Sequence, residues 1–151
     1  MSLNDWLANR WLVAHQASIE EITDLFTVVD RDLEDAALAR LSSDWRLGIS
    51  YNAALQLATL ALAAAGYRPG RERAHERAIL SLRETVGISP AAVDLLDAVR
   101  RKRNQSNYER AGTTSAAEAA ELHKAVTELR RNVVRWLKKN HRGLCPSGIA
   151  S

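Results

Sequence analysis

The sequence predicts an all-α protein, an antiparallel bundle of about five to six helices. Apolar residues recur three and four positions apart in long segments, which is the period of an α-helix rather than a strand. The composition leaves little material for strands and turns, because the 151 residues include only seven glycines, three prolines and one phenylalanine. A chain of this length can bury about 70% of the surface that its unfolded form exposes.

One domain is expected over residues 1–142, followed by a flexible tail over 143–151. Within the domain, an N-terminal helix lies in 1–17 and the bundle takes up 18–142. The sequence contains no repeat and no low-complexity segment. We therefore expect a single helical domain.

The first two helices are predicted from caps and apolar spacing. A short amphipathic helix is expected from Leu3 to about Ala17. Ser18 and Glu21 have the spacing of a capping box, in which the serine hydroxyl accepts a backbone N–H and the glutamate reaches back to the cap residue. The second helix then continues to about Leu41. Its apolar residues step by four and three in alternation: Ile22, Phe26, Val29, Leu33 and Ala36.

The segment from Trp45 to Ala65 is apolar on every side, so we expect it to form the central, buried helix. Its many alanines allow neighbouring helices to approach closely. Gly66 stands where a helix often ends in a left-handed residue. Residues 67–70 are expected to form a turn.

Three further helices complete the predicted bundle. The fourth is expected over about 71–86, and the fifth begins at Ser89, with Pro90 in its first turn. Ser115 and Glu118 form a second capping-box pattern before a long last helix. Basic side chains gather toward the end of that helix, where cations interact favourably with the helix dipole.

A basic, polar segment from Arg100 to Arg110 interrupts the helical pattern, with five positive charges and one negative. A basic run at the end of a helix can simply complement the dipole and stay solvated. Amide and hydroxyl side chains follow the charges over 104–107, however, and these residues are unfavourable inside helices. Their presence favours a second interpretation, an anion-binding site. The pattern does not tell whether the helix continues through 104–111.

Charge is distributed unevenly along the chain. Residues 1–45 carry nine acids and three arginines, a charge of −6. Since the net charge of the chain is +3, the remaining residues carry +9. Such an asymmetry can steer an anionic partner toward the basic part, or favour head-to-tail contacts between copies.

Several classes of protein are not expected. The longest nearly apolar run, 53–67, is shorter than the roughly 20 residues that span a bilayer, so we expect no membrane segment. The N-terminal residues do not form a secretory signal, which predicts a cytoplasmic protein. Cys145 is the only cysteine and is expected to be an inert thiol. The histidines are scattered singly, so we expect neither a metal site nor a cofactor: His15, His75, His123 and His141.

The four tryptophans, Trp6, Trp11, Trp45 and Trp136, are expected in packing or in a dimer interface. No basic groove interleaves them in the sequence. We therefore do not expect them to be stacking platforms for bases.

Several of these features together resemble the HEPN (higher eukaryote and prokaryote nucleotide-binding) domain family. The features are a Tyr- and Ala-rich helix ending at Gly66, a helix with a single histidine at His75, Arg103-Asn104 followed by Tyr108, and a long last helix. The resemblance covers about 18–140 and suggests a divergent bacterial member. It implies an all-helical, usually dimeric protein. Many members are metal-independent ribonucleases, often toxins beside a nucleotidyltransferase-like antitoxin.

The resemblance also implies a catalytic motif. In the family an arginine, a polar residue and, after about three more residues, a histidine meet across a dimer to line one cleft. Arg103 and Asn104 match the start of this motif, and Tyr108 occupies the position of the histidine. Tyrosine titrates near 10 and histidine near 6.5, so tyrosine is a poor base at neutral pH. We therefore expect weaker catalysis than in a histidine-bearing member.

Helical geometry extends this candidate site. In an unbroken helix Arg103 shares its face with Arg100 and Asn107, which makes these three the expected ligand-binding residues. His75 either stays on the surface or approaches the cleft as a fourth. The cleft would close only if a second subunit supplied its other wall.

Three functions follow as hypotheses. The first is a homodimeric HEPN-like protein that binds RNA or a nucleotide phosphate through Arg103, Asn104 and Tyr108. The second is a metal-independent endoribonuclease, a toxin paired with a nucleotidyltransferase-like antitoxin, in which Tyr108 or His75 acts as the base. The third is an interaction protein whose acidic and basic parts bind other copies.

Overall fold

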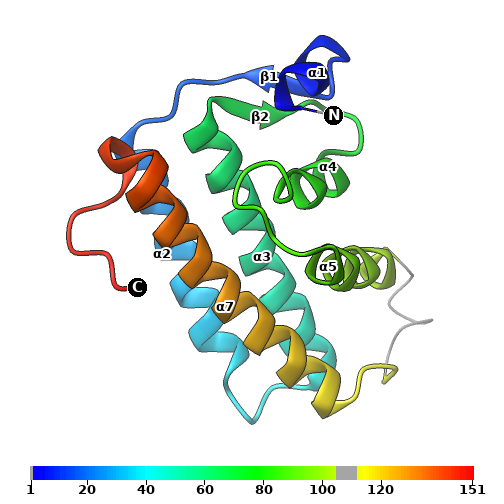
Figure 1. Ribbon diagram of the computed structural model, residues 1–151. Coiled ribbons are helices and arrows are strands. Elements are labelled where there is room, and N and C mark those ends of the chain that lie inside the picture. Colours follow the sequence, from blue (N-terminus) through cyan, green and yellow to red (C-terminus); the bar gives the residue numbers. More distant parts are fainter. Residues whose placement is uncertain (1, 105–111) are drawn as a thin grey trace.

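The structure, a computed structural model, describes residues 2–104 and 112–151 (Figure 1). Six α-helices dominate the described residues, so the prediction of an all-α helical bundle is confirmed. A two-stranded sheet and one short 3-10 helix accompany them. In chain order the elements are α1 (Leu3–Ala8), β1 (Leu12–Ala14), α2 (Ile19–Ala36), α3 (Ser43–Ala65), β2 (Tyr67–Pro69), α4 (Ala74–Ser81), α5 (Pro90–Arg103), α7 (Ala116–Asn140) and η1 (Arg142–Leu144).

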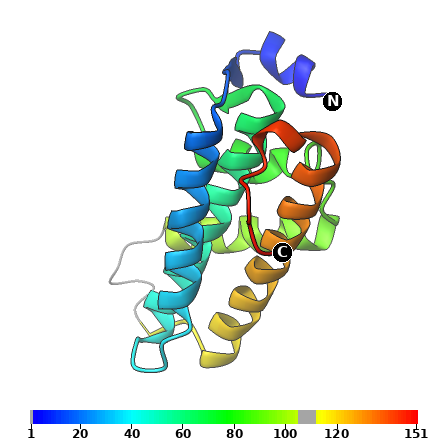
Figure 2. The same ribbon diagram turned by 90° about the vertical axis from the view of Figure 1, so that its left-hand side faces the viewer.

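Helix α3 is the centre of the bundle, as its all-round apolar sequence predicts. It contacts α2, α7, α4 and α5, and most of its side chains are buried. Long helices α2 and α7 lie along it, whereas α5 runs across it (Figures 1 and 2). By length and composition α3 alone among the described helices could span a membrane, but 72% of its apolar window is buried inside the bundle. Its apolar surface is therefore used for packing.

Interhelical hydrogen bonds fix the directions of the long helices. His123 on α7 lies 2.8 Å from the carbonyl oxygen of Leu33 on α2, and Asn52 on α3 donates to Asp32 on α2 at 2.7 Å. Helix α2 is therefore antiparallel to both neighbours, as expected for this bundle. Helices α3 and α7 run in the same direction, because α4 and α5 return the chain to the end where α3 began (Figure 2).

Serine caps start five of the helices: Ser2, Ser18, Ser42, Ser89 and Ser115. The capping box of Ser115 and Glu118 is present in full. That of Ser18 is only half formed, since Ser18 accepts the Glu21 N–H while the Glu21 carboxylate binds the His15 ring at 2.8 Å. The prediction for Glu21 was wrong because a nearby histidine competes for its carboxylate.

The helix predicted over 3–17 ends at Ala8, which corrects the N-terminal part of the expected domain. Arg10 adopts a left-handed conformation (φ 63°), and β1 then pairs antiparallel with β2, where a turn was expected. The position after β2 requires a glycine, because a Cβ on Gly70 would lie 2.9 Å from the carbonyl oxygen of Arg10. Strands of three residues leave almost no periodic signal in a sequence.

Two other helices are shorter than predicted. Helix α2 ends at Ala36 rather than near Leu41, and Arg46 on α3 donates to its free terminal carbonyl at 2.9 Å. Helix α4 covers only 74–81, and turns over 82–86 replace its second half. Several of the bonds in these turns run three residues back, for example from Glu84 to Ser81 at 2.9 Å.

The C-terminal residues, for which a flexible tail is expected, lie against the bundle. Leu144, Cys145 and Ile149 pack on the core. Arg130 on α7 donates to the carbonyl oxygen of Ala150 at 2.6 Å. The apolar residues of the tail are few and irregularly spaced, so its contacts do not show in the sequence pattern.

We expect Arg130→Ala to lower the free energy of unfolding by about 1–3 kcal/mol, as measured by urea titration. The guanidinium is 12% exposed, binds Asp30 at 2.6 and 3.2 Å and lies 5.4 Å from the centre of the Phe26 ring. Arg131→Ala is the matched control, because Arg131 is 54% exposed and its one ion pair among the described residues is with Glu128 on its own helix. Its expected cost is below about 0.5 kcal/mol. Equal losses in the two variants would contradict the role of Arg130.

Candidate anion-binding site

Three of the candidate residues lie together. His75, Arg100 and Asn104 line one depression of about 340 Å³ between the start of α4 and the end of α5. Its other lining residues are Arg71, Arg73, Ala74 and Glu76. His75 therefore approaches the basic end of α5 rather than standing apart on the surface.

Helix α4 begins at the edge of this depression. Its cap residue, Arg73, is left-handed (φ 53°) and provides no side-chain cap. A non-glycine residue in this region carries strain of about 1 kcal/mol or more. Because the Arg73 side chain does not cap the helix, the N–H groups of Ala74, His75 and Glu76 have no hydrogen bond to any described residue. Free N–H groups at the start of a helix favour a nearby anion.

A fork of hydrogen bonds holds the Arg73 side chain. Its guanidinium donates to both carboxylate oxygens of Glu76, at 2.6 and 2.7 Å. The hydrogen bond from Arg73 holds the pKa of Glu76 below its ordinary value. Glu76 therefore stays ionised and neutralises Arg73.

Helix α5 supplies the opposite side. Arg100 is 18% exposed and donates to Asp97 at 2.8 Å, which holds the guanidinium in place. Asn104 ends the helix, and its backbone N–H binds the carbonyl oxygen of Arg100 at 3.2 Å. The amide side chain of Asn104 has no hydrogen bond to any residue in 2–104 or 112–151. It is therefore free to bind a ligand.

Arg103 lies beside the depression, over the central helix. Its guanidinium is 5.0 Å from the centre of the Tyr51 ring, and its Nε lies 3.9 Å from where a Cβ on Gly48 would be. The side chain of Arg103 is exposed. Arg100 lies toward α4 and Arg103 lies over α3. This agrees with the expectation that the two arginines share one face of α5.

The carboxylates in this region leave a positive excess. Arg71, Arg73, Arg100 and Arg103 stand against Glu76 and Asp97, a net charge of +2 with His75 neutral. Glu76 is paired with Arg73, and Asp97 is paired with Arg100 and, at 3.5 Å, with Arg101. Arg71 and Arg103 have no ion pair with any described residue, so they are the cations most available to an anion.

Tyr51 lies under this cluster and is 1% exposed. Burial raises the pKa of its hydroxyl, with Arg103 and Arg100 acting in the opposite direction, so the phenol stays neutral at physiological pH. The hydroxyl has no hydrogen-bond partner among the described residues. Tyr51 is thus a core residue whose hydroxyl is left without a hydrogen bond.

We expect Tyr51→Phe to raise the free energy of unfolding by about 1 kcal/mol, because it removes a desolvated hydroxyl that lacks a partner. Tyr67→Phe is the control, since the Tyr67 hydroxyl donates to Asn4 at 2.7 Å. That change is expected to cost up to about 1 kcal/mol. A loss of stability in Tyr51→Phe, measured by urea titration, would mean that the hydroxyl has a partner after all.

Asn107 and Tyr108, the other candidate residues, lie outside the described residues. Sequence reasoning missed the contribution of Arg71 and Arg73. A run of charged residues before α4 is visible in the sequence, but the left-handed cap that turns it toward α5 is not.

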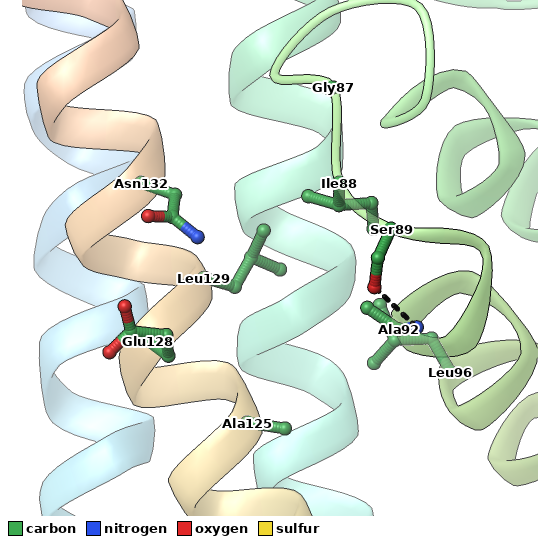
Figure 3. Close-up of a pocket in the computed structure, with 9 residues that line it drawn as sticks. All are labelled: Gly87, Ile88, Ser89, Ala92, Leu96, Ala125, Glu128, Leu129 and Asn132. Carbon is green, nitrogen blue, oxygen red and sulfur yellow. Dashed lines mark hydrogen bonds between the residues drawn. The ribbon is translucent and has the colours of Figure 1, made fainter.

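A second pocket, of about 390 Å³, lies between the start of α5 and α7 (Figure 3). Its floor is apolar, and its polar groups are already bonded within the protein. Ser89 caps α5, Glu128 pairs with Arg131, and Asn132 accepts from Arg135 at 3.2 Å. It offers no unpaired charge to a ligand, so it is the weaker candidate.

Among the residues that the structure describes, no three His, Cys, Asp or Glu side chains are grouped so that they could hold a metal ion. The fold and the depression define an all-α bundle with a cationic site at the meeting of two helix ends. No family model matches the chain, and no curated protein or solved structure matches it either.

Proposed function

We propose that this protein is a HEPN-like, homodimeric module that binds RNA or a nucleotide phosphate at the depression between α4 and α5. The observation that carries the proposal is the meeting of His75, Arg100 and Asn104 in one depression. In the sequence, Asn104 belongs to the motif of the resemblance, Arg100 is connected to it through helical spacing, and the place of His75 is left open. A second copy would supply the opposite wall of the site.

The chemistry of the depression suits a phosphate. A guanidinium matches two phosphate oxygens with parallel N–H donors. Arg71 and Arg103 are the arginines without an ion pair, and the Asn104 amide adds a neutral donor. The first residues of α4, whose N–H groups are uncapped, line the same depression. These groups together offset the unfavourable negative end of the α5 dipole.

The salt dependence of RNA binding tests this proposal. Each arginine that contacts a phosphate is expected to contribute about one unit to the slope of log affinity against log salt concentration. Arg103→Ala should therefore lower that slope by about one unit. Arg101→Ala is the control, because Arg101 is 67% exposed and lines a different surface hollow with Lys102. Binding that is independent of salt, or an unchanged slope in Arg103→Ala, would reject the proposal.

A second candidate function is metal-independent RNA cleavage, and the position of His75 favours it. Cleavage needs a base for the 2′-hydroxyl proton, cations for the charged phosphorane and an acid for the leaving oxygen. His75 can serve as base or acid, and Arg100 and Arg103 can stabilise the charge. The protein would then be a ribonuclease toxin with a nucleotidyltransferase-like antitoxin.

Incubating a mixed single-stranded RNA with the purified protein in EDTA separates the two functions. Cleavage that is lost in His75→Ala would support the ribonuclease. If the RNA binds but remains intact for hours, the ribonuclease is rejected and the function is binding alone. Light scattering on the same sample reports whether the protein is a dimer.

A further inference from the structure

Trp45 differs from the other tryptophans in its surroundings. Trp6 and Trp11 stack edge to face at 5.8 Å, and Trp136 lies 4.7 Å from His141. Trp45 is 68% exposed and has no ring or cation contact with any described residue. An indole is among the most favourable side chains to bury, so such exposure indicates a surface that another molecule covers.

The position of Trp45 on α3 connects it to the cationic site. Gly48 follows it by three residues, which places the two about 4.5 Å apart along the axis and on neighbouring parts of one face. Gly48 and Tyr51 are the residues over which Arg103 lies. The backbone of Trp45 therefore lies about one helical turn from Gly48, the residue that Arg103 approaches.

The other side of Trp45 is also held in place. Its neighbour Asp44 accepts the Gly112 N–H at 2.8 Å, which ties the start of α3 to the residues that precede α7. This hydrogen bond lowers the pKa of Asp44, and the charge of Lys102 acts in the same direction from the end of α5. Lys102 and Arg103 thus flank the helical turn that carries Trp45. The turn of α3 that carries Trp45 is therefore held close to the end of α5.

We infer that Trp45 is a stacking platform for a nucleobase of a single-stranded RNA whose phosphate is bound by Arg103. The inference rests on the proposed function and names the form of its ligand. An exposed aromatic ring next to phosphate-binding cations is the combination that single-strand binders use, because every base has a face that can stack. In a duplex those faces are hidden between base pairs. The site therefore favours unpaired RNA.

The test compares three ligands by fluorescence anisotropy: a 12-nucleotide single-stranded RNA, a duplex of the same length, and a 12-unit oligomer that lacks bases. Trp45→Ala is expected to weaken binding of the single strand roughly tenfold. Binding of the base-free oligomer should not change, because it contacts only the arginines. Trp45→Phe should restore most of the affinity, since its ring can still stack. Leu38→Ala, another exposed apolar residue, is the matched control and should change nothing.

The outcomes separate this inference from the proposed function. If Arg103→Ala weakens binding of all three ligands and Trp45→Ala weakens binding of none, the cationic site is supported and the stacking role of Trp45 is overturned. If no ligand binds the unmodified protein, both fail. If Trp45→Ala instead turns a dimer into a monomer by light scattering, Trp45 is covered by a second copy, and the stacking role is likewise overturned.

Discussion

Removing the two unpaired arginines in and beside the depression, in Arg71→Ala/Arg103→Ala, is expected to weaken RNA binding about 100-fold at low salt. A hydrogen bond to a charged group contributes about 1.5–3 kcal/mol, and tenfold in affinity corresponds to about 1.4 kcal/mol. Neither arginine is paired with a described carboxylate, so both can give their donors to phosphate. Both side chains are exposed, and the variant should fold normally. Anisotropy with a labelled single-stranded RNA measures the loss.

The control removes the same amount of charge elsewhere. Arg101→Ala/Arg131→Ala deletes two exposed arginines that do not line the depression, with exposed fractions of 67% and 54%. We expect its affinity to fall by less than about threefold, through the weaker overall field alone. A loss as large as that of the first variant would show that binding depends on net charge and not on the depression.

Leu57→Ala is expected to lower the free energy of unfolding by about 3 kcal/mol. Leu57 lies in the middle of α3 and is fully buried, so its truncation leaves a cavity among the helices packed around it. Leucine-to-alanine changes in packed cores cost about 2–5 kcal/mol. Urea unfolding followed by circular dichroism measures the change.

Leu38→Ala makes the same chemical change outside the core. Leu38 is 39% exposed and follows the end of α2, so its expected cost is below about 1 kcal/mol. If both variants lost the same stability, α3 would not be the centre of the core. A small effect in both would lead to the same conclusion.

The central helix could be predicted because its own residues determine its surroundings. Residues 45–65 are apolar on all sides, and such a helix is stable only when other helices cover it. Gly66 ends it in the left-handed conformation (φ 102°) that the sequence indicates. The caps at Ser89 and Ser115 were equally predictable, since a cap depends on residues three positions away.

The features that the sequence did not reveal depend on residues far apart in the chain. Strand β1 exists because it meets β2 more than fifty residues later. The half-formed cap at Ser18 depends on His15, which was considered only as a metal ligand. No local sequence pattern predicts the pairing of β1 with β2 or the hydrogen bond between His15 and Glu21.

The candidate site shows the same division. The basic end of α5 was visible as a run of charges. The inclusion of His75 required the left-handed Arg73 and the packing of α4 against α5, neither of which the period of apolar residues encodes. Trp45 was expected in packing because a tryptophan usually is buried, and only its exposed fraction distinguishes it from the other three.

The position of the bound phosphate tests the account most directly. Amide chemical shifts of ¹⁵N-labelled protein, titrated with a short single-stranded RNA, locate it. We expect the largest changes at Ala74, His75 and Glu76, which line the depression at the uncapped start of α4, and at Arg100 and Asn104 on α5. Changes gathered instead around Leu129 and Ile88, in the pocket between α5 and α7, would contradict the assignment of the site. An absence of changes at any RNA concentration would contradict RNA binding itself.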